Sequence, residues 1–130
     1  MTRKYVFVCV QNAGRSQMAA AFARQIGGPE VEALSAGTKP AKNVHPEVIQ
    51  VMLEKGIDLS NVKPQKITSA ILKGAHAIIT MGCGASDFCP VFLLKKVVEW
   101  HIEDPHGQPL EKVRSIRDEI ERRVQDLLRQ

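Results

Sequence analysis

Short apolar, β-rich runs alternate with amphipathic helical segments along this 130-residue chain. The runs near 4–10, 31–35, 75–81 and 97–102 lack regular polar alternation, which is typical of strands covered on both faces. Helical patterns are predicted over 16–26, 45–55, 65–73 and 110–128. This alternation predicts right-handed βαβ units, and therefore an α/β fold with four parallel strands and helices on both faces of the sheet.

The apolar spacing within the helical segments supports this order. Met18, Phe22 and Ile26 recur at four-residue intervals, and Gly27 and Gly28 follow them as a stop signal. The last segment carries the longest apolar stripe, made of Val113, Ile116, Ile120, Val124 and Leu127.

Length and composition limit the classes of protein to consider. The length predicts one domain, 1–130, and 44% hydrophobic with 25% charged residues is ordinary for a globular protein. The apolar runs are too short for a secretion signal or a membrane span, so we expect a cytoplasmic monomer with no membrane partner. The net charge of +4 is dispersed, and one Trp, one Tyr and four Phe offer little base stacking, so no nucleic-acid partner is expected.

Three cysteines, Cys9, Cys83 and Cys89, are an odd number for a disulfide framework. In a reducing compartment, catalytic or redox thiols remain open as interpretations. There is no Cys-x-x-Cys pair, and the four histidines lack the spacing of a zinc finger. We therefore expect no metal site and no bound cofactor.

The sequence CVQNAGRS at 9–16 carries the strongest chemical signal. A strand is predicted before it and a helix after it, with small Ala13 and Gly14 where the backbone must curl. Consecutive N–H groups in such a turn form an anion-binding nest, and the positive end of the helix favours a thiolate as well. The planar fork of Arg15 can hold two oxygens of a tetrahedral anion. The alternative is a buried structural Cys9 with Arg15 in a surface ion pair.

Two more reactive side chains are expected beside this loop. Cys9, Cys83 and Asp104 all fall just past predicted strand ends, and parallel strands present their carboxyl ends at one edge of the sheet, where ligands bind. An isolated Asp-Pro such as Asp104-Pro105 is usually a turn, so position alone leaves the role of Asp104 open.

Five segments together resemble the low-molecular-weight protein tyrosine phosphatase superfamily, and especially its arsenate reductase branch. They are CVQNAGRSQMAAAF from residue 9, SAGT at 35–38, GIDLS at 56–60, TMGCGASDFCP at 80–90 and WHIEDPHG at 100–107. They occur in the same order and cover nearly the whole chain. The resemblance implies a flavodoxin-like three-layer sandwich with strand order 2-1-3-4, and reduction of arsenate to arsenite, with phosphate or sulfate as competing oxyanions.

The resemblance also implies roles for individual residues. Cys9 would be the nucleophile, Ser16 would hydrogen-bond its thiolate, and Asp104 would protonate the leaving oxygen. The oxyanion would be held by the Arg15 side chain and by the backbone amides of Val10, Gln11, Asn12, Ala13, Gly14 and Arg15, with Asn12 bracing the loop. Some members bind potassium through a glutamate and a threonine, but this chain has Ala20 and Lys63 at those positions.

Cys83 and Cys89 separate two enzymatic interpretations. A phosphatase hydrolyses its intermediate with water, whereas a reductase needs two electrons from thiols. The reductase interpretation is a relay: Cys83 attacks Cys9, and Cys89 then attacks Cys83. The pliable stretch 82–86 would allow this movement. An external thiol reductant, with thioredoxin favoured over another thiol-redox protein, would complete the cycle. A phosphatase and a non-catalytic oxyanion or thiol-redox sensor remain the alternatives.

Overall fold

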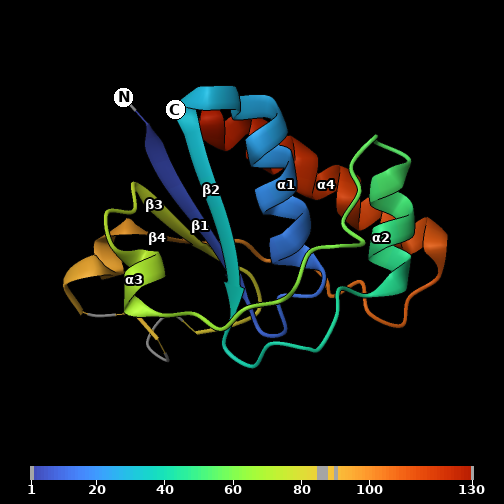
Figure 1. Cartoon of the computed structure of the whole chain (residues 1–130), viewed down its shortest axis with the longest axis horizontal. Coiled ribbons are helices and arrows are strands. Elements are labelled where there is room, and N and C mark those ends of the chain that lie inside the picture. Colours follow the sequence, from blue (N-terminus) through green and yellow to red (C-terminus); the bar gives the residue numbers. More distant parts are fainter. Residues whose placement is uncertain (1, 85–87, 90, 130) are drawn as a thin grey trace.

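Four parallel strands form one sheet in the order β2-β1-β3-β4 (Figure 1). The computed structural model describes residues 2–84, 88–89 and 91–129. The strands are β1 (Arg3–Cys9), β2 (Val31–Gly37), β3 (Ala77–Thr80) and β4 (Val97–Glu99). The predicted parallel sheet and its strand order are confirmed.

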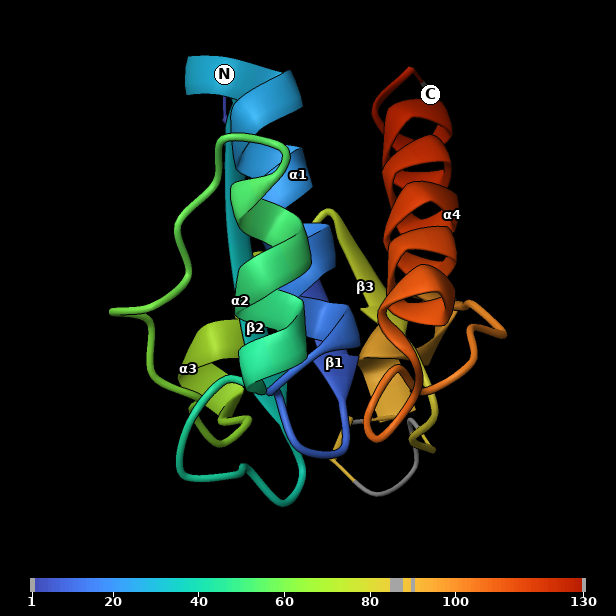
Figure 2. The ribbon, with the colours of Figure 1, turned by 90° about the vertical axis from the view of Figure 1, so that its right-hand side faces the viewer.

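Helices cover both faces of this sheet. On one face lie α1 (Arg15–Gly27), α2 (Pro46–Leu53) and α4 (Leu110–Leu128), and on the other lie α3 (Ser69–Leu72) and the 3₁₀ helix Val91–Lys96 (Figures 1 and 2). A second 3₁₀ helix, Gly28–Glu30, joins α1 to β2.

Alternate side chains of β1 enter two different cores. Tyr5, Phe7 and Cys9 belong to the large apolar cluster with α1, α2 and α4, whereas Val6 and Val8 belong to the smaller cluster on the α3 face. Because both faces are buried, β1 reads as a continuous apolar run instead of an alternating one.

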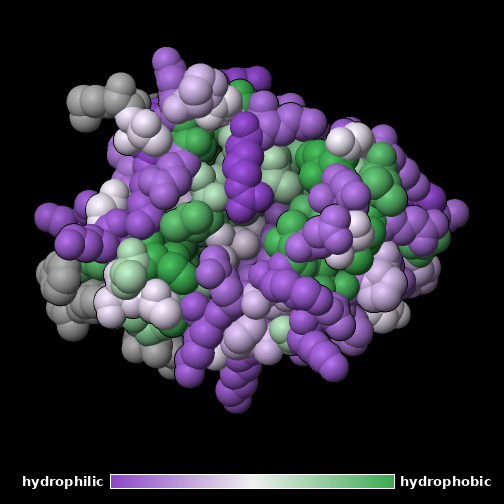
Figure 3. Space-filling view, viewed as in Figure 1, coloured by the Kyte–Doolittle hydropathy of each residue, from purple (hydrophilic) through white to green (hydrophobic). Residues whose placement is uncertain are grey.

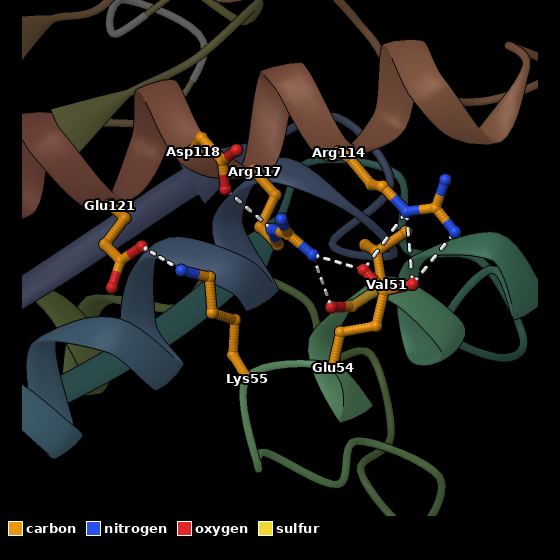
Figure 4. Close-up of polar contacts among 7 residues, drawn as sticks. All are labelled: Val51, Glu54, Lys55, Arg114, Arg117, Asp118 and Glu121. Atoms are coloured by element: carbon orange, nitrogen blue, oxygen red, sulfur yellow. Dashed lines mark hydrogen bonds and ion pairs between the residues drawn. The ribbon is translucent and has the colours of Figure 1, made fainter.

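Polar contacts join α2 to α4 (Figure 4). Arg117 of α4 is 7% exposed and donates to the Val51 carbonyl at 3.0 Å and to Glu54 Oε1 at 2.7 Å. Arg114 also donates to Glu54, and Lys55 pairs with Glu121 at 3.0 Å. Hydrogen bonds from the two arginines lower the pKa of the Glu54 carboxyl. These acceptors satisfy the hydrogen-bonding groups of the Arg117 cation, which is buried between α2 and α4.

The predicted helix over 65–73 is wrong in its first half. Only Ser69–Leu72 is helical, with Thr68 accepting a capping bond from the Ile71 amide at 3.2 Å. Lys66 instead forms a parallel bridge with Gly37. The Gly37 amide donates to the Gln65 carbonyl at 2.8 Å, and the Ile67 amide donates to the Gly37 carbonyl at 3.0 Å. Pairing with the end of β2 therefore overrides the local helical preference.

β3 and β4 are shorter than the predicted runs 75–81 and 97–102. The Trp100 amide still donates to the Thr80 carbonyl at 2.9 Å, and beyond it the chain leaves the sheet. The segment that follows β4 is therefore not paired in the sheet, and it forms one wall of the candidate active site described below.

The surface shows hydrophobic side chains in separate patches divided by hydrophilic ones on the face drawn in Figure 3. Among the side chains that the structure describes, the large hydrophobic ones that are exposed lie on four different elements: Ile26, Leu53, Leu94 and Val98. Among the described residues, none of the helices combines the length and the apolar character needed to cross a membrane.

Candidate active site

The loop between β1 and α1 curls around a cavity of about 300 Å³. Cys9 ends β1 and is 3% exposed. The neighbouring segment donates hydrogen bonds to the loop's carbonyls: from Thr38 to Cys9, Lys39 to Val10, Ala41 to Gln11 and His45 to Ala13, at 2.8–3.2 Å. In a trans peptide the C=O and the following N–H point in opposite directions. The amides of Val10, Gln11, Asn12 and Gly14 therefore point away from this segment, as an anion nest requires.

Gly37, at the end of β2, permits this close packing. It is the register partner of Cys9. A Cβ at this position would lie 2.5 Å from the Val10 carbonyl oxygen and 2.9 Å from the Asn12 nitrogen. Neither backbone atom can move without opening the loop, so glycine is required. The sequence signal for it was the SAGT segment, which did not reveal the reason.

Asn12 braces the loop from inside. It is fully buried and has a left-handed φ of 53°. Its Nδ2 donates to Ser16 Oγ at 2.8 Å, and its Oδ1 accepts from the Gln65 amide at 2.9 Å and from Gln17 Nε2 at 3.1 Å. Gln17 Nε2 also donates to the Asn12 carbonyl at 3.1 Å. Bonds from three directions hold this left-handed conformation, which asparagine adopts more readily than most other non-glycine residues.

The Cys9 sulfur receives two short polar contacts. Ser16 Oγ lies 2.8 Å from Sγ, and the Asn12 amide donates to Sγ at 3.3 Å. Because Asn12 Nδ2 donates to Ser16 Oγ, the serine hydroxyl hydrogen is available to the sulfur. The two contacts hold the Cys9 sulfur in place at the floor of the loop.

Arg15 and Asp104 meet at the same cavity. The Arg15 guanidinium donates to the Ile102 carbonyl at 3.0 Å, and its Nη2 lies 3.8 Å from Asp104 Oδ2. Asp104 is 60% exposed and accepts from the His106 amide at 3.0 Å. A Cβ on Gly82 would lie 2.5 Å from Arg15 Nη1, so glycine lets the guanidinium reach this position.

The N-terminus of α1 is also open to a ligand. The capping residue, Gly14, makes no side-chain capping bond, and the first turn of the helix contains no acidic residue. An anion in the cavity would therefore satisfy helix amides without competition from a carboxylate of that turn. The cavity is lined by Cys9, Arg15 and Asp104, and by all the residues predicted to supply backbone donors except Asn12, namely Val10, Gln11, Ala13, Gly14 and Arg15.

Cys83 lies at the edge of this arrangement. Its Sγ donates to the Val8 carbonyl at 3.6 Å, one residue before Cys9, and the Met81 amide donates to the same oxygen at 2.8 Å. Gly82 lines both the Cys9 cavity and a second cavity of about 570 Å³ that Cys83 and Trp100 line. Cys83 thus borders the site from the strand edge.

Cys89 lies in a different environment from the other two thiols. It is 8% exposed and belongs to the core cluster on the α3 face, against which Cys83 also packs. Burial raises the pKa of the Cys89 thiol. Of the stretch predicted to be pliable, Gly82 has a left-handed φ of 78°, and residues 85 and 86 lie outside the described part.

One cluster at the site was missed by sequence reasoning. His45, Glu47 and His106 gather beside Asp104, although their numbers suggest no common motif. The test for zinc-finger spacing could not detect them, because they come from the start of α2 and from the loop before α4, which only the fold brings together. Burial, followed by the nearby His106, lowers the pKa of His45, while Glu47 and Asp104 act in the opposite direction.

Comparison with known proteins agrees with this geometry. Residues 4–130 match the family model described as low molecular weight phosphotyrosine protein phosphatase. A Halobacterium salinarum protein named "Putative arsenate reductase" is 46% identical over 97% of this chain and 91% of its own length. The glutaredoxin arsenate reductase of a Synechocystis species is 35% identical over 97% of this chain and 96% of its own.

A solved structure shares the fold closely. The thioredoxin-dependent arsenate reductase of Corynebacterium glutamicum superposes with a TM-score of 0.83 at 35% identity. The match covers 98% of this chain and 61% of the Corynebacterium chain, so this chain spans about three fifths of that relative's length.

Proposed function

This chain belongs to the low molecular weight phosphotyrosine protein phosphatase family, and we propose that within it the chain, as one catalytic domain, reduces arsenate to arsenite. The observation that carries the proposal is the position of the Cys83 thiol, which donates a hydrogen bond to the carbonyl of Val8, the residue before Cys9. A phosphatase needs the loop, the arginine and the acid, but it has no use for a second thiol at that position. The names of the relatives support the same activity.

The first step is attack by the Cys9 thiolate on arsenic. The oxyanion is bound by the Arg15 guanidinium and the loop amides, whose orientation precedes binding and therefore costs little reorganisation. Asp104 donates a proton to the oxygen that leaves as water, and a Cys9–arsenic bond forms. Because Arg15 Nη2 lies 3.8 Å from Asp104 Oδ2, the acid is within reach of an oxyanion on the arginine.

The second step transfers two electrons. The Cys83 thiolate attacks the Cys9 sulfur, a sulfur–sulfur bond forms, and the electron pair of the sulfur–arsenic bond stays on arsenic, which leaves as arsenite. Cys89 then attacks the Cys83 sulfur and releases the Cys9 thiolate. Cys83 and Cys89 pack in one cluster on the α3 face, which supports this second exchange.

The reductant closes the cycle by reducing the Cys83–Cys89 disulfide with two external thiols. We assign this role to a thioredoxin-type dithiol protein. The similar Corynebacterium enzyme is described as thioredoxin-dependent, whereas the similar Synechocystis enzyme is described as a glutaredoxin arsenate reductase. A relay that ends in an internal disulfide suits a dithiol donor, because one donor molecule supplies both electrons.

The test is arsenate-dependent NADPH oxidation, measured once with thioredoxin and its reductase and once with glutathione, glutaredoxin and their reductase. We expect turnover in the first system. Turnover only in the second would keep the activity and change the reductant. Aryl phosphate hydrolysis without arsenate turnover in either system would favour the phosphatase, and the absence of both reactions would favour the sensor.

A further inference from the structure

A cluster of three metal-ligand side chains stands at the mouth of the Cys9 cavity. His45 precedes α2, Glu47 lies in its first turn, and His106 follows Asp104-Pro105 in the loop before α4. The two imidazole rings stack with centroids 4.1 Å apart, and His106 Nδ1 lies 3.5 Å from Glu47 Oε1. One ligand atom from each residue lies within 4.8 Å of the others. We propose that these three residues bind a zinc-type divalent cation.

The donor set determines the class of ion. Two imidazoles and one carboxylate are ligands that Zn²⁺ and its neighbours in the first transition row prefer, whereas Mg²⁺ and Ca²⁺ prefer oxygen ligands alone. Three protein ligands leave the fourth position for water or an oxyanion. This site therefore differs in chemistry from the thiols of the proposed relay.

A buried oxygen of Glu47 supports a ligand at this point. Glu47 Oε1 is inaccessible to solvent and accepts no hydrogen bond from any residue in the described ranges. The ion-pair contact of this oxygen with His106 Nδ1, at 3.5 Å, exists only when that ring is protonated, and a coordinated cation would satisfy the oxygen in its place.

Two of the ligand atoms already lie near a coordination distance, and the His106 ring must turn to complete the set. Tetrahedral bonds of about 2.0–2.1 Å place ligand atoms about 3.3 Å apart. The 3.5 Å separation of His106 Nδ1 and Glu47 Oε1 is already close to this value. The His106 side chain is 59% exposed, so it can rotate out of the ring stack until its lone pair converges with that of His45.

An ion here would join two walls of the active site. Asp104 accepts from the His106 amide at 3.0 Å, and His45 Nε2 lies 3.1 Å from Gln11 Oε1 in the nucleophile loop. A metal ion bound here would therefore connect the loop that carries Asp104 to the start of α2. If the proposed function holds, bound zinc is expected to slow turnover.

Isothermal titration of the reduced, full-length protein with Zn²⁺ tests the site. We expect one equivalent to bind to the cluster, and His106→Ala and Glu47→Gln each to weaken binding by more than the ~10–100-fold typical of losing an outer-shell partner. His101→Ala is the matched control, because His101 is also an exposed histidine beside a carboxylate, 3.3 Å from Glu99, but belongs to no such cluster among the residues that the structure describes. The His101 variant should bind as the wild type does.

Cobalt substitution separates this site from the thiols. Co²⁺ bound by imidazole and carboxylate gives visible bands without a sulfur-to-cobalt charge-transfer band. A charge-transfer band that disappears in Cys9→Ser, or binding that survives both His106→Ala and Glu47→Gln, would overturn the proposal. These measurements need no turnover, so they stand or fail independently of the arsenate reductase activity.

Inhibition by zinc is the final readout. Arsenate turnover by the wild type should fall at zinc concentrations that saturate the site, and turnover by His106→Ala should not fall at the same concentrations. Equal inhibition of both proteins would assign the effect to the thiols and would overturn the link between the cluster and Asp104.

Discussion

The loop from Cys9 to Ser16 and the segment that carries Cys83 and Cys89 adjoin at one edge of the sheet, yet they are held very differently. The loop is fixed by the buried Asn12, by Gln65 and by backbone bonds from residues 38–45. In the second segment, Gly82 has a left-handed φ of 78°, and Cys83 and Cys89 pack with the apolar cluster on the α3 face.

This difference corresponds to two demands of the proposed reaction. Stabilising a transition-state oxyanion favours donors that do not move. Thiol–disulfide exchange requires sulfur atoms to travel into contact. The sheet also separates the partners, because Cys9 packs in the core beneath α1 whereas Cys83 and Cys89 belong to the α3 face. In the relay, Cys83 must therefore pass around the strand ends to reach Cys9.

Cys9→Ser should have the largest effect. We expect kcat for both arsenate reduction and aryl phosphate hydrolysis to fall more than ~10⁴-fold, because a serine hydroxyl is a weak nucleophile in this nest. Steady-state assays with both substrates measure it. Retention of either activity would remove Cys9 from the chemistry.

Replacing the second and third thiols should separate the two regions. Cys83→Ser should lose arsenate turnover while keeping aryl phosphate hydrolysis, since the rigid loop remains intact. Cys89→Ser should complete one round of arsenate reduction and stall as a Cys9–Cys83 disulfide, identifiable by mass spectrometry of proteolytic peptides.

The matched comparison between these two variants is decisive. Continued turnover of Cys89→Ser with thioredoxin as sole donor would rule out a three-cysteine relay. Loss of aryl phosphate hydrolysis in Cys83→Ser would instead mean that the segment supports the loop structurally.

Asp104→Asn should have an intermediate effect. Loss of a general acid typically costs ~10²–10⁴-fold in rate, whereas the Arg15 guanidinium and the loop amides still bind the oxyanion. Single-turnover kinetics should slow, with little change in the inhibition constant of phosphate. An unchanged single-turnover rate would mean that Asp104 only forms the turn in which it accepts from the His106 amide.

Asn12→Ala tests the rigidity of the loop through stability. It removes the buried acceptor of the Gln65 amide and one of the two acceptors of Gln17 Nε2, and it places alanine at a φ of 53°, so we expect a loss of about 2–4 kcal/mol in the free energy of unfolding. Asn43→Ala, at an exposed asparagine that accepts from Lys63, should change it by less than ~0.5 kcal/mol. If urea unfolding gave equal losses of unfolding free energy for Asn12→Ala and Asn43→Ala, the role of Asn12 in bracing the loop would be contradicted.

The same contrast explains which features could be predicted from sequence. Buried positions recur along an element in a regular pattern, so they leave apolar runs in strands and apolar stripes along helices. The four strands and the helix Leu110–Leu128 could therefore be located from the sequence. The positions of Cys9, Cys83 and Asp104 followed from the rule that parallel strands end at one edge. The extended path of 65–67 and the gathering of His45 with His106 depend on contacts between distant segments, and no local pattern encodes them.

The smallest expected effect concerns pH and the buried third thiol. Because burial raises the pKa of Cys89, the thiol is protonated at neutral pH, and its thiolate fraction grows as the pH rises toward that pKa. If exchange by Cys89 limits turnover, the rate should rise by up to about tenfold per pH unit above pH 7. Alkylation of Cys89 by iodoacetamide, followed by peptide mass spectrometry, measures its ionisation directly. The pH of half-maximal rate, which is independent of access, should be higher in the folded protein than in the urea-unfolded chain. A midpoint equal to or below that of the unfolded chain would mean that the α3-face cluster opens before the thiol reacts, so the second region would be looser than its packing indicates.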